Sequence, residues 1–275
     1  MTENAFIHAP EDSGVPASAR DFSVQDRVVI VTGAGQGIGR EFAKQFAAAG
    51  AVAVVADLNA EAAQRVAAEI EGAGGKAMAV TLDIADRGSV DAMVAAVVDR
   101  FGRIDALINN AALFGGLKGG RFDAISEAEW DAAMAVNVKG IWNCCKAVVP
   151  AMRQAGGGSI VNIASLAATY GMPYGLHYTT SKAAVIGLTR GLARELGRDD
   201  IRVNAVAPSA VLTEGTREFF AEKTDKALDT IKMNQAIARN LESADLVGTV
   251  HWLVSDASRL VTGQTIAVDG GTVMH

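Results

Sequence analysis

The strongest constraint on the fold is a regular alternation of short apolar runs and amphipathic stretches. Runs rich in β-branched residues occur at 27–33, 51–57, 76–83, 104–110, 159–165, 201–208 and 264–271. Stretches with helical spacing occupy 38–50, 59–75, 85–102, 126–154, 178–196 and 243–254. Buried strands that alternate with helices are typical of a parallel sheet covered on both faces. We therefore predict a single α/β domain, doubly wound around seven parallel strands.

Composition and charge narrow the possible partners. Half of the 275 residues are hydrophobic, and the net charge is −6 without any run of Lys or Arg, which argues against nucleic acid. No apolar stretch approaches the roughly 20 residues that span a membrane. Cys144 and Cys145 are adjacent, so they cannot close a useful loop, and they lack zinc-site spacing. We expect buried thiols in a reducing cytoplasm and no metal.

Two segments break the alternation. Residues 1–25 mix Pro, Ser, Ala and acids without periodicity or a signal-peptide pattern, so we predict a flexible N-terminal extension before a domain at 26–275. Residues 209–240 have helical spacing but no strand, and they follow a strand directly. We interpret 209–240 as a substrate lid, with a surface insertion as the alternative.

A glycine-rich turn, "TGAGQGIG" at 32–39, lies between the first strand and the first helix. Glycines there let the backbone approach a pyrophosphate, and the helix N-terminus supplies free N–H groups. The candidate cofactor residues of the turn are Gly33, Gln36, Gly37, Ile38 and Gly39. The glycine spacing does not fit G-x-G-x-x-G literally, and tight turns need glycine in any case, so the turn alone is weak evidence for a nucleotide site.

Acidic residues at strand ends make the turn more informative. Asp57 ends the second strand, where a carboxylate accepts hydrogen bonds from the adenine ribose and repels a 2′-phosphate. Gln36 is neutral, so the pattern favours NAD, and the nearby Arg40 leaves some room for NADP. Asp83, at the end of the third strand, could bond the adenine amine. For Asp57 and Asp83 the alternative role is a helix cap.

Only three tyrosines occur, Tyr170, Tyr174 and Tyr178, and only Tyr178 has a lysine, Lys182, four residues ahead. Residues i and i+4 share a helix face. A phenol has a pKa of about 10, and a nearby ammonium lowers it toward the range of a general base. Lys182 can also reach the ribose of the nicotinamide half. We therefore predict that Tyr178 transfers the proton that accompanies a hydride.

The residues before Tyr178 have other predicted roles. Ser165, at the end of the strand 159–165, is placed to polarise a substrate oxygen. Glycines and a proline interrupt any helix through Tyr170 and Tyr174, so we expect both on a loop, as pocket wall or alternatively as core. We interpret His177 as a solvated loop histidine rather than a base.

These motifs together resemble the short-chain dehydrogenase/reductase family over about residues 24–275. The resemblance rests on "TGAGQGIG", "NNAA" at 109–112, Asn137, Ser165, "YTTSK" at 178–182, "NAVAPSAVLT" at 204–213 and "VTGQTIAVDGG" at 261–271. It implies a Rossmann fold, an NAD cofactor and a homotetramer packed through the helices that carry Asn137 and Tyr178 and through the C-terminal segment. His275 is then either a subunit contact or a frayed end.

The resemblance also assigns roles to single residues. Asn137 resembles the family asparagine that holds a relay water beside Lys182, with an Asn bonding its own helix as the alternative. Ala112 and Ser209 stand where the family usually has glycine. We therefore expect the detailed geometry of the cofactor site to differ from that of typical members. Further cofactor contacts implied by position are Leu58, Ile84, Asn110, Ala111, Pro208, Val211 and Thr213, with the Val211 backbone facing the carboxamide.

The candidate pocket walls are mostly apolar and predict a neutral substrate. They are Leu113, Phe114, Leu166, Ala167, Tyr170, Tyr174, Phe219 and Phe220. No arginine is predictably placed among them to clamp a carboxylate or phosphate. We expect an NAD-dependent alcohol dehydrogenase or carbonyl reductase that acts on a hydrophobic or aromatic secondary alcohol and its ketone. The alternatives are an NADP-dependent ketoreductase similar to 3-oxoacyl-carrier-protein reductases, and a non-catalytic nucleotide-binding scaffold.

Overall fold

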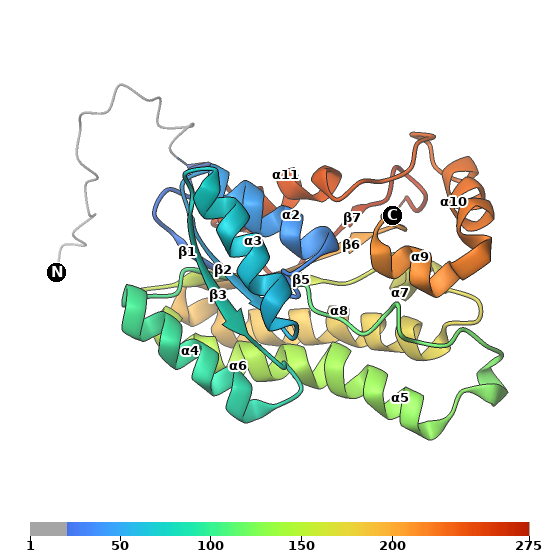
Figure 1. The fold of residues 1–275 in the computed structure, drawn as a ribbon, viewed down its shortest axis with the longest axis horizontal. Helices are drawn as coiled ribbons and strands as arrows, with labels where there is room; N and C mark the ends of the chain where they lie inside the picture. The colour runs from blue at the N-terminus through green and yellow to red at the C-terminus, as the bar shows by residue number, and fades with distance from the viewer. Residues whose placement is uncertain (1–20, 275) are drawn as a thin grey trace, which may run out of the picture.

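Seven parallel strands form one sheet in the order β3-β2-β1-β4-β5-β6-β7 in the computed structural model, which describes residues 21–274 (Figure 1). They are β1 (Val28–Thr32), β2 (Val52–Asp57), β3 (Lys76–Thr81), β4 (Ala106–Asn109), β5 (Gly158–Ile163), β6 (Ile201–Pro208) and β7 (Thr265–Val268). The strand order reverses between β1 and β4, which opens a crevice at their carboxyl ends. The predicted doubly wound sheet is therefore confirmed.

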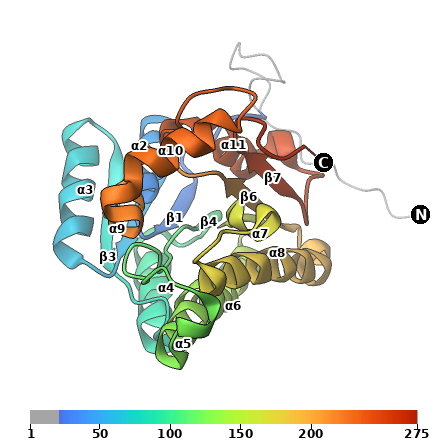
Figure 2. The same ribbon diagram turned by 90° about the vertical axis from the view of Figure 1, so that its right-hand side faces the viewer.

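Helices cover both faces of the sheet (Figures 1 and 2). One face packs against α2 (Gly37–Ala48), α3 (Ala60–Gly72) and α11 (Ala244–Val254). The other packs against α4 (Arg87–Phe101), α6 (Ile141–Gln154) and α8 (Leu176–Leu196). Each face buries its own apolar cluster, so the sheet is a rigid platform whose carboxyl edge carries the connecting loops.

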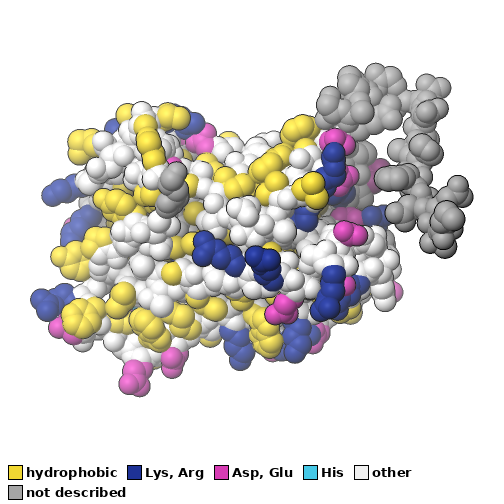
Figure 3. Space-filling view, turned by 180° about the vertical axis from the view of Figure 1, so that it is seen from behind, with side chains coloured by type: hydrophobic (Ala, Val, Ile, Leu, Met, Phe, Trp, Pro, Cys, Tyr) yellow, Lys and Arg dark blue, Asp and Glu magenta, His cyan; other side chains and the backbone are white. Residues whose placement is uncertain are grey.

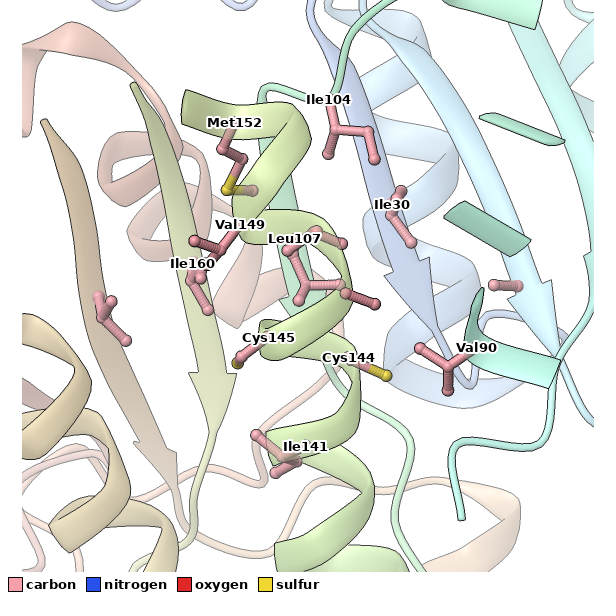
Figure 4. Packing of buried hydrophobic residues seen from close by; sticks show 14 of the residues in the cluster. Ile30, Val90, Ile104, Leu107, Ile141, Cys144, Cys145, Val149, Met152 and Ile160 are labelled. Atoms are coloured by element: carbon pink, nitrogen blue, oxygen red, sulfur yellow. The ribbon is translucent and has the colours of Figure 1, made fainter. Parts of the chain in front are cut away.

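Helix α6 presents its apolar side to the sheet, as Figure 4 shows for Ile141, Cys145 and Val149 beside Leu107 and Ile160. Both cysteines are free and buried, as the sequence predicted. Burial raises the pKa of the two thiols well above the ordinary value, so they stay protonated and serve as packing groups.

The long helix predicted over 126–154 is divided into three parts. Residues Glu127–Met134 form α5, Ala135–Gly140 form a π-helical segment, and α6 follows. A capping box between Ser126 and Glu129 fixes the start of α5. π-helical turns inside α-helices are frequent at functional sites, and this one contains Asn137.

The segment after β6 contains two further helices, α9 (Glu214–Phe220) and α10 (Thr224–Met233). Figure 2 shows α9, α10 and the short α7 (Ala167–Tyr170) on the side of the molecule to which the carboxyl ends of the strands lead. Among residues 21–274, no helix is long and apolar enough to cross a membrane.

The ends of the chain are described in part. Residues 1–20 of the predicted extension and His275 lie outside the described residues. Val24 is buried in the cluster beneath α2, and the Asp21 carbonyl accepts a hydrogen bond from the Ala257 N–H at 2.9 Å. The packed domain thus includes residues that the sequence placed in the extension.

Candidate active site

The glycine turn forms a cradle at the start of α2. Gly33 and Gly37 have φ angles of +64° and +53°, which disfavour any side chain. A Cβ at Gly39 would collide with the Gly33 carbonyl, so the turn packs without room for a methyl group. Gln36 is the N-cap of α2 but makes no side-chain capping bond, and the first turn has no acid. The helix N-terminus therefore fits an anionic group such as a pyrophosphate.

Asn110 joins the end of β4 to this cradle. Its Nδ2 donates to the carbonyls of Thr32 and Gly33 at 3.0 and 3.1 Å. The Thr32 hydroxyl accepts the N–H groups of Asn110 and Ala111 at 3.1 and 3.0 Å. The two predicted cofactor residues thus hold the turn in place.

Asp57 lies beside the turn and is not a helix cap. Its Oδ2 accepts the Gly35 N–H at 2.8 Å, and its Oδ1 accepts the Asn59 N–H at 2.9 Å. The cap of α3 is Asn59, which accepts the Ala62 N–H at 3.0 Å. The capping alternative for Asp57 is therefore wrong, and its carboxylate sits at the edge of the cradle. Leu58, the next residue, is exposed.

Asp83 is exposed and follows β3 by two residues. Its Oδ1 accepts the Ala85 N–H at 2.8 Å, whereas the cap of α4 is Asp86. The capping alternative is wrong for Asp83 as well. Ile84 is buried, and its carbonyl accepts the Asn143 amide at 3.0 Å.

A polar pocket of about 410 Å³ opens at the cradle. Leu212, Thr213 and Glu214 from the segment after β6 line it opposite Gly37. Val211, which precedes them, is buried and forms an isolated bridge with Leu241. The structure thus brings Thr213 to the glycine turn, although the two are remote in sequence. The pocket also contains Arg65, Ser243 and Glu214, none of which the sequence pattern singled out.

Tyr178 and Lys182 lie on one face of α8. The Lys182 ammonium is 5.6 Å from the centre of the Tyr178 ring and donates to the Ile163 carbonyl at 2.8 Å. Only 2% of Lys182 is exposed, and burial lowers its pKa to about 8. Burial raises the pKa of the Tyr178 phenol to about 12, while the Ser165 hydroxyl acts in the opposite direction. The predicted lowering of the Tyr178 pKa is therefore not observed, because desolvation outweighs the hydrogen bond with Ser165.

Ser165 lies between β5 and α7, next to the end of the strand as predicted. Its Oγ accepts the Ala167 N–H at 3.1 Å. The next residue, Leu166, donates its N–H to the Pro208 carbonyl at 2.8 Å. This bond joins the loops after β5 and β6, so Ser165 and Pro208 occupy the same edge of the sheet.

Asn137 is fully buried in the π-helical segment. Its Oδ1 accepts the Leu113 N–H at 2.7 Å, and its Nδ2 donates to the Leu113 carbonyl and the Ser181 hydroxyl, both at 3.1 Å. The alternative that Asn137 bonds its own helix backbone is wrong. Its amide therefore connects Leu113, in the loop after β4, with Ser181 of α8, the residue that precedes Lys182.

An aromatic cluster covers Tyr178. The Phe114 ring lies 4.6 Å from the Tyr178 ring, and Phe219 stacks on Phe114 at 4.6 Å. Phe220 meets Phe219 edge-on at 5.2 Å. Leu166 and Ala167 are buried at the start of α7. Two residues of the segment after β6 and one of the loop after β4 thus form an aromatic cluster at the phenol.

Tyr170 and Tyr174 are not brought to the phenol. Tyr170 ends the short helix α7 rather than lying on a loop, and 64% of it is exposed. Tyr174 has φ +64° and is 67% exposed. It lines a separate apolar pocket of about 330 Å³ with Gly120, Phe122 and Leu176.

His177 differs from its predicted environment. Helix α8 begins at Leu176, two residues earlier than expected, so His177 lies inside the first turn and is fully buried. Its Nδ1 accepts the Tyr178 N–H at 2.9 Å, and its Nε2 has no partner among residues 21–274. The prediction of a solvated loop histidine is wrong.

Comparison with known proteins agrees with this geometry. Residues 33–273 match the profile of a family described as enoyl-(acyl carrier protein) reductase. A 3-oxoacyl-[acyl-carrier-protein] reductase, FabG, of Thermotoga maritima is 37% identical over 251 residues, which span 91% of this chain and 99% of the relative.

Solved structures show the same fold. A 7α-hydroxysteroid dehydrogenase complexed with NADH and 7-oxo glycochenodeoxycholic acid has a TM-score of 0.87 and 35% identity, and the match covers 94% of this chain and 98% of that one. A putative NAD(P)-dependent gluconate 5-dehydrogenase of Beutenbergia cavernae with bound NADP has a TM-score of 0.85 and 35% identity, and the match covers 92% and 98%. The chain belongs to the short-chain dehydrogenase/reductase family of oxidoreductases.

Proposed function

We propose that this protein is an NAD-dependent oxidoreductase that interconverts a hydrophobic or aromatic secondary alcohol and its ketone. The observation that carries the proposal is the packing of Phe114 on the Tyr178 ring, because it gives the proton-transferring phenol an apolar surround. Phe219 extends that surround from the lid. A bulky apolar substrate buries the most apolar surface against such walls and therefore gains the most binding free energy from them.

The choice of NAD rests on charge at the cradle. The Asp57 carboxylate lies beside Gly35 and would repel a 2′-phosphate, while Gln36 supplies no positive charge. The α2 N-terminus would hold the pyrophosphate, and Lys182 the ribose of the nicotinamide half. Val211 and Thr213 are the proposed carboxamide contacts. When bound, the nicotinamide supplies the carbon that gives or takes the hydride.

The proton is moved by residues of this chain. In alcohol oxidation the Tyr178 oxygen takes the proton from the substrate hydroxyl, and in reduction it returns the proton to the carbonyl oxygen. The Lys182 ammonium stabilises the phenolate. The Ser165 hydroxyl hydrogen-bonds the substrate oxygen as charge changes there. The Asn137 amide bonds Leu113 and Ser181, next to Lys182, and its Oδ1 keeps one lone pair, so we propose Asn137 as the residue that holds the relay water beside Lys182.

A second candidate is an NADP-dependent 3-oxoacyl-carrier-protein reductase. The similarity to the Thermotoga maritima reductase favours it. One experiment separates the two: initial rates with aromatic and aliphatic secondary alcohols, their ketones and an acetoacetyl thioester, each with both cofactors. We expect the largest kcat/KM for an apolar alcohol–ketone pair with NAD. A dominant rate for the thioester with NADPH would establish the second candidate instead.

We also propose a homotetramer that packs through the π-helical segment and its flanking helices, through α8 and through the C-terminal segment. Trp142 on α6 is 43% exposed, although tryptophan is usually largely buried. Light scattering of the purified protein measures the mass directly, and a monomer at all concentrations contradicts this proposal.

The face in Figure 3 shows basic side chains scattered among acidic and apolar ones, without a large basic patch.

A further inference from the structure

Two arginines line the nucleotide pocket, and only one of them is neutralised. Arg40 of α2 donates its Nε to the Glu69 carboxylate at 3.1 Å. Lys44 forms an ion pair with the same carboxylate at 3.5 Å. The arginine that the sequence pointed to as a possible NADP contact is therefore held by a neighbouring helix.

Arg65 of α3 is the other guanidinium in the pocket. Its Nη2 donates to the Gly35 carbonyl at 3.5 Å, which is a long and weak hydrogen bond. Within residues 21–274 no carboxylate forms an ion pair with Arg65, and its side chain is exposed. A guanidinium has five N–H donors in a fork that matches a phosphate, so Arg65 has donors to spare.

Gly35 places Arg65 close to the predicted ribose site. The Gly35 N–H donates to Asp57 at 2.8 Å, and the Gly35 carbonyl accepts from Arg65. The carboxylate and the guanidinium are therefore held by the two sides of one residue. Gln36, the next residue, is exposed and carries no charge. A positive charge thus reaches this edge of the pocket from α3 instead of from the glycine turn.

We propose that Arg65 contacts the 2′-phosphate of NADP and thereby limits how strongly this protein discriminates against that cofactor. The inference rests on the proposed nicotinamide-dinucleotide site. Asp57 beside the turn and the pocket acids Glu41 and Glu214 oppose a phosphate, so NAD stays preferred and Arg65 narrows the preference. The remaining acid of the pocket, Glu69, is paired with Arg40 and Lys44. A Lys at position 65 would keep the charge but lose the fork.

The test measures binding of adenosine fragments to the full-length protein by isothermal titration calorimetry. The probes are 5′-AMP and 2′,5′-ADP, which differ by the 2′-phosphate and lack nicotinamide. We expect Arg65→Gln to raise the dissociation constant of 2′,5′-ADP about fivefold, and to change that of 5′-AMP by less than about twofold. The dissociation constant of 2′,5′-ADP for Arg65→Lys should lie between the values for the wild type and Arg65→Gln. The effect of Arg65→Gln should shrink at high salt, because an exposed charge pair is screened.

Arg40→Gln is the matched control, because it removes the guanidinium that Glu69 already neutralises. We expect it to leave the ratio of the two dissociation constants unchanged. If Arg65→Gln weakens both fragments equally or neither of them, Arg65 does not read the 2′-phosphate and the inference fails, while the proposed function stands. If the wild-type protein binds neither fragment, the nucleotide site itself is wrong.

Discussion

The ring of Phe114 packs on the ring of Tyr178, with centroids 4.6 Å apart and an angle of 41° between the planes. Phe114 follows β4, and Tyr178 lies in the first turn of α8, so the contact joins two connections at the carboxyl edge of the sheet. An apolar ring thus touches the group that we propose exchanges a proton with the substrate.

Replacing Phe114 by alanine should impair catalysis with aromatic substrates more than with small ones. The change removes the wall that packs on Tyr178, so we expect kcat/KM for an aromatic alcohol to fall about tenfold or more. The dissociation constant of NAD should stay within about twofold. Phe122→Ala is the control, since Phe122 is exposed and lines the separate pocket. Equal losses for both variants would contradict a wall specific to Phe114.

Tyr178→Phe should abolish proton transfer without disturbing binding. Only the hydroxyl is removed, so turnover should fall by about 10² to 10⁴, the usual range for a lost general acid–base group. NAD affinity, measured by fluorescence titration, should be nearly unchanged. Tyr174→Phe, at an exposed tyrosine of the same stretch, should retain full turnover. A Tyr178→Phe enzyme with near-normal turnover would remove Tyr178 from the mechanism.

Much of this site follows from the sequence because its signals are local. Tyr178 and Lys182 share a helix face through their spacing alone, and Asp57 stands where a buried strand ends. Parallel strands then bring such ends to one edge.

The parts that sequence reasoning missed depend on tertiary packing. Arg65 has ordinary helical spacing, and nothing in its neighbours shows that it faces Gly35. His177 is buried because α8 starts earlier than the glycine and proline pattern indicates. The π-helical turn at Asn137 forms where its amide bonds Leu113, a contact between segments far apart along the chain.

Asp57→Asn should narrow the preference for NAD over NADP. The amide no longer repels a 2′-phosphate but can still bond the ribose. We expect the ratio of kcat/KM values for the two cofactors to fall about tenfold. Asp83→Asn is the control, because we place Asp83 at the adenine, which both cofactors share. An unchanged ratio in Asp57→Asn would assign selectivity to another residue.

Gln235→Ala should loosen the segment 209–240, which we propose as a substrate lid. The Gln235 amide donates to Ser209 at 3.1 Å, which ties the turn after α10 to the residue that follows β6. Its loss should cost about 1 kcal/mol locally. We expect faster limited proteolysis within 214–233 while the Tm changes little. Gln264→Ala, at an exposed glutamine, is the matched control. Unchanged cleavage would mean that other contacts hold the lid.

Lys182 should make stability rise with pH on the alkaline side. Burial lowers its pKa from 10.5 to about 8, so between these values the unfolded chain binds more protons than the folded one. Unfolding free energy therefore increases with pH in this window, by about 2 kcal/mol from about pH 8 to about pH 9.5. Above about pH 10 the raised pKa of Tyr178 acts in the opposite direction, because the folded phenol keeps its proton.

Urea unfolding of the wild type and of Lys182→Met at several pH values measures this contribution. The variant should lack the alkaline gain, since methionine does not titrate. Lys226→Met, at an exposed lysine of α10, should keep it. If the wild type and Lys182→Met respond identically to pH, Lys182 keeps its proton throughout the window. The ammonium then stabilises the Tyr178 phenolate at every pH of the assay, and any alkaline rise in turnover belongs to Tyr178 alone.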